Sequence, residues 1–184
     1  MDMMLPTELA PAHYAVPGLV NDALVADAVP DAGLALAPAR LLQYKPDGCV
    51  ALPVHTTIEL LDGPLMIDVP GATGYCNRLV RWRGQWLALL DLDTLLHACT
   101  GAGRAGAPRY ALVVAWQHAP GWPVEHGAIG LATLPQTVGV GDQAGCELPA
   151  DSALWPLLAL SCFRHEGHEV PILDTARLFA VHHG

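Results

Sequence analysis

The chain has 184 residues, of which 52% are hydrophobic and 15% are charged, so it has enough apolar side chain for one compact unit or two small ones. Its formal net charge is −9, from 18 acidic and 9 basic residues, and the basic residues are scattered along the chain. This charge argues against nucleic acids and anionic membrane surfaces as partners, because both attract clustered Lys and Arg.

The five cysteines are odd in number and show no Cys-x-x-Cys spacing, so neither a disulfide framework nor a zinc knuckle is indicated and we expect reduced thiols. The N-terminus lacks the basic start and apolar run of a secretory signal. The longest apolar stretch, residues 153–163, is too short to span a bilayer. We therefore expect a cytoplasmic protein without direct membrane insertion.

Residues 1–38 are rich in Ala, Pro and Asp, and their prolines interrupt most possible helices, so we expect an irregular N-terminal arm with at most a short helix near residues 19–28. From Arg40 onward the chain consists of short apolar segments separated by turn residues. The first pair flanks Pro46-Asp47-Gly48, which is typical of a β-hairpin.

Further strand-sized segments follow between Gly- and Pro-containing turns, and this pattern favours an all-β barrel or sandwich over alternating βαβ units. Short helices are expected after Asp91 or Asp93, after Asp151 and after Asp174, because Asp is a favoured N-cap residue. The expected strands are 49–54, 65–69, 79–83, 86–90, 110–116, 128–134 and 170–173.

The segments 83–96 and 166–179 repeat one pattern. Gly84 aligns with Gly167, 83 residues later, and the match continues without a gap through an apolar strand, an Asp and an amphipathic segment. A weaker repeat aligns residues 51–54 with 128–131. Two similar offsets predict that the second half resembles the first, as two tandem β-barrels that share an apolar seam. We place barrel one at about 39–100 and barrel two at about 109–180, within a domain of 39–180.

The ordered segments also resemble a known family. The first half contains VALPVHTTIELL and IDVPGATGYCNRLVRWRGQWLALLDLDTLL, and the second contains YALVVAW, HGAIGLATLPQTVGV and LALSCFRHEGHEVPILDTARLF. In this order, over about residues 40–180, they resemble the CheW-like domain, the adaptor module of bacterial chemosensory arrays. The resemblance implies two tandem five-stranded SH3-like barrels with short helices and a C-terminal helix.

The resemblance further implies a non-enzymatic scaffold, with no cofactor or metal, that couples chemoreceptors to a CheA-type histidine kinase. In such adaptors the kinase's own CheW-like domain docks barrel to barrel, and the methyl-accepting receptor's hairpin tip packs near the groove between the barrels. The long arm and the segment Leu134-Pro135-Gln136 depart from the family pattern. An adaptor for type IV pilus twitching motility, of the PilI type, therefore fits as well as one for flagellar chemotaxis.

A Glu and an Arg that pair near the docking surface in the family have counterparts at Glu59 and Arg83. An exposed ion pair contributes only about 0–1 kcal/mol to stability, so we expect this one to shape a docking surface. Aromatic residues beside an Arg are typical of docking hot spots, although core packing is the usual role of Trp. Exposed apolar residues would extend the patch. The expected protein-binding residues are Glu59, Arg83, Val54, Ile58, Trp82 and Trp86.

The alternative is a small metal-dependent hydrolase that uses the His-rich second half, above all His165-x-x-His168 with Glu166 and Glu169. These residues straddle the turn at Gly167, where strand alternation sends neighbours to opposite faces, so a solvated hairpin tip is favoured. Neither serine lies in a Gly-x-Ser-x-Gly elbow. A module that binds proline-rich peptides is a third hypothesis.

Overall fold

The computed structural model describes residues 35–97 and 106–180. The chain divides into two units, Met1–Gly33 and Leu34–Gly184, and the fold described here is that of the second. The expected arm of residues 1–38, including its short helix, therefore lies outside the described residues except at its end. There Ala37 and Pro38 already belong to the first strand, because they pair with Val140 and Gly139.

The fold is all-β with short helices, as expected from the alternation of apolar segments and turns. The strands are β1 (Ala37–Lys45), β2 (Gly48–Pro53), β3 (Thr57–Asp62), β4 (Met66–Asp68), β5 (Arg78–Trp82), β6 (Gln85–Leu90), β7 (Tyr110–Trp116), β8 (Glu125–Leu131), β9 (Gln136–Val140), β10 (Ala159–His165) and β11 (His168–Leu173). The helices are α1 (Leu92–Leu96), α2 (Trp155–Leu158) and α3 (Thr175–Ala180), with 3₁₀ turns η1 (Val54–Thr56), η2 (Gly74–Cys76) and η3 (Asp142–Ala144). Within the described ranges, each helix is too short to cross a bilayer.

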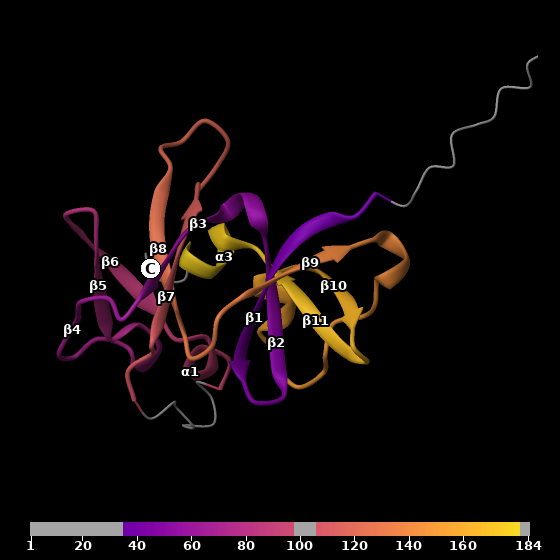
Figure 1. Ribbon diagram of the computed structural model, residues 1–184, viewed down its shortest axis with the longest axis horizontal. Helices are drawn as coiled ribbons and strands as arrows, with labels where there is room; N and C mark the ends of the chain where they lie inside the picture. The colour runs from indigo at the N-terminus through magenta and orange to yellow at the C-terminus, as the bar shows by residue number, and fades with distance from the viewer. Residues whose placement is uncertain (1–34, 98–105, 181–184) are drawn as a thin grey trace, which may run out of the picture. The chain divides into compact units, whose positions relative to one another are not determined.

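The two barrels exchange strands, which corrects the sequential division at 39–100 and 109–180. One sheet has the order β10-β11-β2-β1-β9, and the other has the order β3-β7-β8-β6-β5-β4. Each sheet thus combines a hairpin from one half of the chain with strands from the other half, as Figure 1 shows for β1 and β2 beside β10 and β11. The short strand β4 adds a sixth member to the second sheet. Apolar periodicity cannot reveal such an exchange, because it reports which face is buried and not which strand is the neighbour.

The predicted repeat is present as two equivalent hairpins. Trp82 pairs with Gln85 and His165 pairs with His168, so both hairpins have two-residue loops. The loop residues Arg83-Gly84 and Glu166-Gly167 have positive φ, at 44° and 87° and at 49° and 84°. Positive φ at both positions is the signature of a type I′ turn, whose twist matches that of the flanking strands.

Each repeat ends in an Asp-capped helix, as predicted. The Asp91 carboxylate accepts a hydrogen bond from Thr94 N at 3.1 Å, and the Asp174 carboxylate accepts one from Ala176 N at 2.9 Å. Asp151 differs from the expectation. It caps no helix, because α2 begins only at Trp155, and its carboxylate instead accepts a hydrogen bond from Trp155 Nε1 at 2.7 Å.

The weaker repeat explains how the exchanged hairpins dock. Leu89 of β6 is the parallel partner of Ala128 in β8, and Ile172 of β11 is the parallel partner of Ala51 in β2. Leu89 and Ile172 are equivalent positions in the two copies of the repeat 83–96 and 166–179. Ala51 and Ala128 are equivalent positions in the two copies of the weaker repeat. The order β5-β6-β8-β7-β3 therefore corresponds to β10-β11-β2-β1-β9.

One core joins the two sheets. Leu42 and Leu52 from the first sheet and Leu90 and Ile129 from the second belong to a single buried cluster. Helix α3 follows β11 of the first sheet yet packs on β7 of the second. There Thr175 Oγ1 donates a hydrogen bond to the Ala115 carbonyl at 3.2 Å.

Candidate protein-docking site

Glu59 and Arg83 come from opposite ends of the six-stranded sheet but meet where that sheet curls back on itself. Glu59 lies on β3 at one edge, and Arg83 lies in the loop after β5, next to β4 at the other edge. Strand β4 follows β3 along the chain and pairs with β5, so the connection draws the two edges together. Glu59 Oε2 lies 3.0 Å from Arg83 Nη2, and the ion pair expected from the sequence is present.

Trp82 supports this ion pair from the core. Its ring is buried, with 6% of its surface exposed, in a cluster that includes Val80 and Val113. Its Nε1 donates a hydrogen bond of 2.9 Å to Oε2 of Glu59, the same oxygen that pairs with Arg83. The Arg83 guanidinium lies over the Trp82 ring, 4.8 Å from its centroid. The three side chains therefore fix one another, and Trp82 acts as their support and not as an exposed contact.

The electrostatics keep Glu59 ionised. The hydrogen bond from Trp82 is the largest influence on the Glu59 carboxyl. Together with the charge and the hydrogen bond of Arg83 it holds the pKa of this carboxyl below its ordinary value, against the effect of burial, which is second in size and acts in the other direction. Hydrogen bonds to the charged form stabilise that form. The site thus presents one fixed negative and one fixed positive charge side by side.

Ile58 and Trp86 expose apolar surface on the strands that build this site. The register shifts between Thr57 and Glu59, so Ile58 is the extra residue of a β-bulge, and 43% of it is exposed. Bulges re-aim side chains and are frequent at sheet edges. Trp86 on β6 is 38% exposed and stacks with the guanidinium of Arg81, its cross-strand partner, at 5.3 Å.

Val54 is the remaining predicted residue, and it lies half-buried in η1, immediately before β3. Sequence reasoning missed Arg81, which completes the stack on Trp86, and His126 of β8, whose ring lies 4.9 Å from that of Trp82. It also missed exposed apolar side chains that alternate along β3 and along residues 65–67, where β4 begins. These are Leu60, Leu65 and Ile67. A period-two pattern in 58–60 and 65–67 is the signal that was available for them.

Of the comparisons with known proteins, the one with solved structures supports this architecture. No protein-family model and no curated protein sequence matches the chain. Among solved structures, the chain superposes on the scaffolding protein TtCheW from Thermoanaerobacter tengcongensis with a TM-score of 0.63. The match covers 81% of this chain and 96% of that chain, at 11% sequence identity. The fold is CheW-like. At this identity the likeness concerns the fold, and the roles of individual residues must come from their own geometry.

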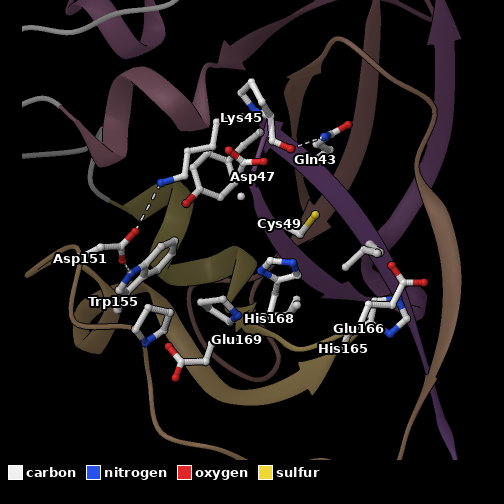
Figure 2. A pocket seen from close by; sticks show the side chains of 17 residues that line it. Gln43, Lys45, Asp47, Cys49, Asp151, Trp155, His165, Glu166, His168 and Glu169 are labelled. Carbon is white, nitrogen blue, oxygen red and sulfur yellow. Dashed lines mark hydrogen bonds and ion pairs between the residues drawn. The ribbon is translucent and has the colours of Figure 1, made fainter.

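The His-rich hairpin β10–β11 lines a cleft of 340 Å³ between the β1–β2 and β10–β11 turns (Figure 2). His165 and His168 are direct cross-strand partners, so they lie on the same face of the hairpin. This corrects the expectation that the turn separates them, because a two-residue loop places its flanking residues opposite each other. Glu166 occupies the turn itself.

The same cleft contains an ion pair at a different part of its lining. Lys45 Nζ lies 3.4 Å from Asp151 Oδ2, while the other carboxylate oxygen of Asp151 accepts the hydrogen bond from Trp155 (Figure 2). Both charges thus have partners within the cleft. Over residues 35–97 and 106–180, no group of three or more His, Cys, Asp or Glu side chains is placed to hold a metal ion.

Proposed function

We propose that the protein is a chemosensory adaptor that acts by binding other proteins and catalyses no reaction. Its partners are a CheA-type histidine kinase and the tip of a methyl-accepting chemoreceptor. The observation that carries the proposal is the Glu59–Trp82–Arg83 arrangement on a CheW-like fold whose strands β3 and β6 also expose apolar side chains. The similar protein TtCheW is described as a scaffolding protein, which supports the same class of function.

The energetics favour binding over stability as the role of these residues. Arg83 and Glu59 have 67% and 40% of their side-chain surface exposed, and exposed ion pairs add little to folding. A charged pair that is already held in one geometry loses less conformational entropy when a partner covers it. Arg and Trp are also enriched among the residues that dominate binding energy. The site therefore has the composition and rigidity of a docking surface.

A scaffold of this kind alters kinase output by contacting two states of the receptor–kinase assembly with different affinity. The net charge of −9 is compatible with protein partners and argues against nucleic acid. We infer a cytoplasmic location at the membrane-associated array, reached through the receptors. Flagellar chemotaxis and type IV pilus motility of the PilI type are both pathways in which such an adaptor works.

The proposal is tested by the substitution Arg83→Glu, which reverses the charge at the docking site and places two carboxylates together. We expect at least a tenfold loss of affinity for the kinase's regulatory domain in titration calorimetry, with an unchanged circular dichroism spectrum. A loss confined to the receptor tip would assign the site to that partner instead. Unchanged affinity for both partners would contradict the proposal.

The repeat supplies a matched control. Arg164→Glu makes the same charge change on the β10–β11 hairpin, where Arg164 is exposed and lies 4.0 Å from Glu169. If binding depends on the Glu59 site, Arg164→Glu leaves the affinity within about twofold. Equal losses for both variants would mean that overall charge, and not this site, governs association.

A further inference from the structure

Two cysteines lie against each other at the seam of the five-stranded barrel. Cys146 Sγ and Cys162 Sγ are 3.2 Å apart, although the residues are separated by 16 positions. The backbone supports this approach, because Cys146 N donates a hydrogen bond of 3.0 Å to the Cys162 carbonyl. Gly145 and Phe163 also form an antiparallel bridge, which makes Cys146 and Cys162 direct cross-strand neighbours.

The cysteine pair lies where the two edges of the five-stranded sheet come together. Strands β9 and β10 are the two edges of the sheet β10-β11-β2-β1-β9. After β9 the chain passes through η3 and reaches the bridge between Gly145 and Phe163, so the segment 141–146 joins one edge to the other. A covalent bond at Cys146 would therefore fasten the barrel where it closes.

We propose that Cys146 and Cys162 are an oxidation site that forms a reversible disulfide across this seam. Only a small movement is required, since the two sulfurs must approach by about 1 Å to reach a bonding distance. The other described cysteines, Cys49 and Cys76, lie on β2 and in η2. This inference is independent of the proposed adaptor function.

The oxidant is a peroxide, and Cys146 is the residue that meets it. Cys146 is half-buried, and it is more exposed than Cys162, of which only 5% is exposed. Hydrogen peroxide oxidises the Cys146 sulfur to a sulfenic acid, and the thiol proton and the hydroxide that leaves the peroxide form water. The Cys162 sulfur then attacks the Cys146 sulfur, loses its proton and expels hydroxide, which becomes water. Two thiols and one peroxide thus give one disulfide and two waters.

The environment of Cys162 makes its attack on the oxidised Cys146 sulfur slow. Burial, followed by the hydrogen bond and charge of Cys146, raises the pKa of the Cys162 thiol to about 12. Cys162 is therefore a thiol at neutral pH, and it reacts as the resolving partner only after Cys146 has been oxidised. The pair stays reduced until an oxidant reaches it.

The test compares the full-length protein before and after a small molar excess of hydrogen peroxide. We expect the number of titratable thiols to fall by two, and peptide mass mapping to find Cys146 linked to Cys162. The melting temperature should rise by about 5–10 °C, because the cross-link restricts the unfolded chain, and reductant should reverse the rise. Hydrogen exchange along β10 should slow in parallel.

Two single substitutions test whether the thermal shift comes from the Cys146–Cys162 pair. Cys146→Ser removes the half-buried partner, with little change to the core, and should abolish the thermal shift. Cys76→Ser is the matched control, since Cys76 is also half-buried but lies in η2, and it should leave the shift intact. An unchanged thiol count in the wild type, a disulfide that involves another cysteine, or a thermal shift that survives Cys146→Ser would each overturn the proposal.

Discussion

The indole N–H of Trp82 donates a hydrogen bond of 2.9 Å to the carboxylate of Glu59, so a ring in the core holds a charge at the surface. The two residues are 23 positions apart and come from strands that are not neighbours in the sheet. Their contact exists only when the barrel is closed. The geometry of the proposed docking site is therefore coupled to the integrity of the fold and not to local sequence.

The first prediction concerns the titration of Glu59. Trp82→Phe keeps an aromatic ring in the core but removes the N–H, which is the largest influence lowering the pKa of Glu59. We expect this pKa to rise toward its ordinary value of 4.5, and a carboxyl carbon NMR titration measures it directly. Trp86→Phe is the control, because Trp86 contacts Arg81 instead. Identical Glu59 titrations in wild type and Trp82→Phe would refute the role of the indole.

The lowered pKa of Glu59 also determines how the stability cost of Trp82→Phe changes with pH. A carboxyl whose pKa is lower in the folded state contributes stability above its unfolded pKa, and this contribution disappears as the pH falls through the folded pKa. Trp82→Phe should therefore cost more stability at pH 7 than at pH 3. Urea unfolding at the two pH values measures the difference in stability between the wild type and Trp82→Phe. An equal cost at both would mean that only packing was lost.

The second prediction uses the two equivalent turns. Glu166 and Arg83 both adopt positive φ, which costs an ordinary L-residue about 1 kcal/mol and suits Asn better. Glu166→Asn should raise the melting temperature by roughly 2–4 °C. Arg83→Asn relieves the equivalent turn but removes the ion pair with Glu59, so it should retain stability while weakening binding to the proposed kinase partner. A destabilised Glu166→Asn variant would contradict the turn assignment.

Local features of this fold were predictable from the sequence, because they depend on short-range chemistry. Turns at Gly84 and Gly167 and helix caps at Asp91 or Asp93 and at Asp174 are expected from the sequence, and the structure contains both turns and has caps at Asp91 and Asp174. The Glu59–Arg83 pair was also anticipated, but through a family resemblance. Nothing in the local sequence of either residue indicates its partner.

Features that depend on long-range pairing were not predictable. The strand β9, QTVGV, has a glycine and few apolar residues, and it forms a strand because β1 provides its backbone partners. Strand β10 was obscured by the apolar run that also contains α2. The exchange of hairpins and the contact between Cys146 and Cys162 have the same origin, since both depend on which edges meet when the sheet closes.

The third prediction concerns the cap of α3. Asp174 accepts hydrogen bonds from Ala176 N and Arg177 N, and its carboxylate also lies 3.3 Å from the Arg177 side chain. Asp174→Ala should destabilise the fold by about 1 kcal/mol, as is usual for N-caps. Asp174→Asn retains an acceptor and should cost less. Chemical denaturation ranks the variants, and an equal loss for both would assign the effect to charge instead of capping.

The last prediction tests how the barrels are joined. A Cβ atom added at Gly127 would collide with the ring of Phe179 on α3, and that ring is buried and stacked on Trp116 with centroids 6.1 Å apart. Because the buried ring must shift away from its packing partners to admit the methyl group, Gly127→Ala should cost about 1–3 kcal/mol in urea unfolding. Gly74→Ala is the control, since its new Cβ makes only an ordinary contact of 3.7 Å with Thr94. Adding Phe179→Leu should recover part of the loss in a double-mutant cycle, because the smaller side chain leaves room for the methyl group. Purely additive costs would mean that α3 does not hold the sheet at this point.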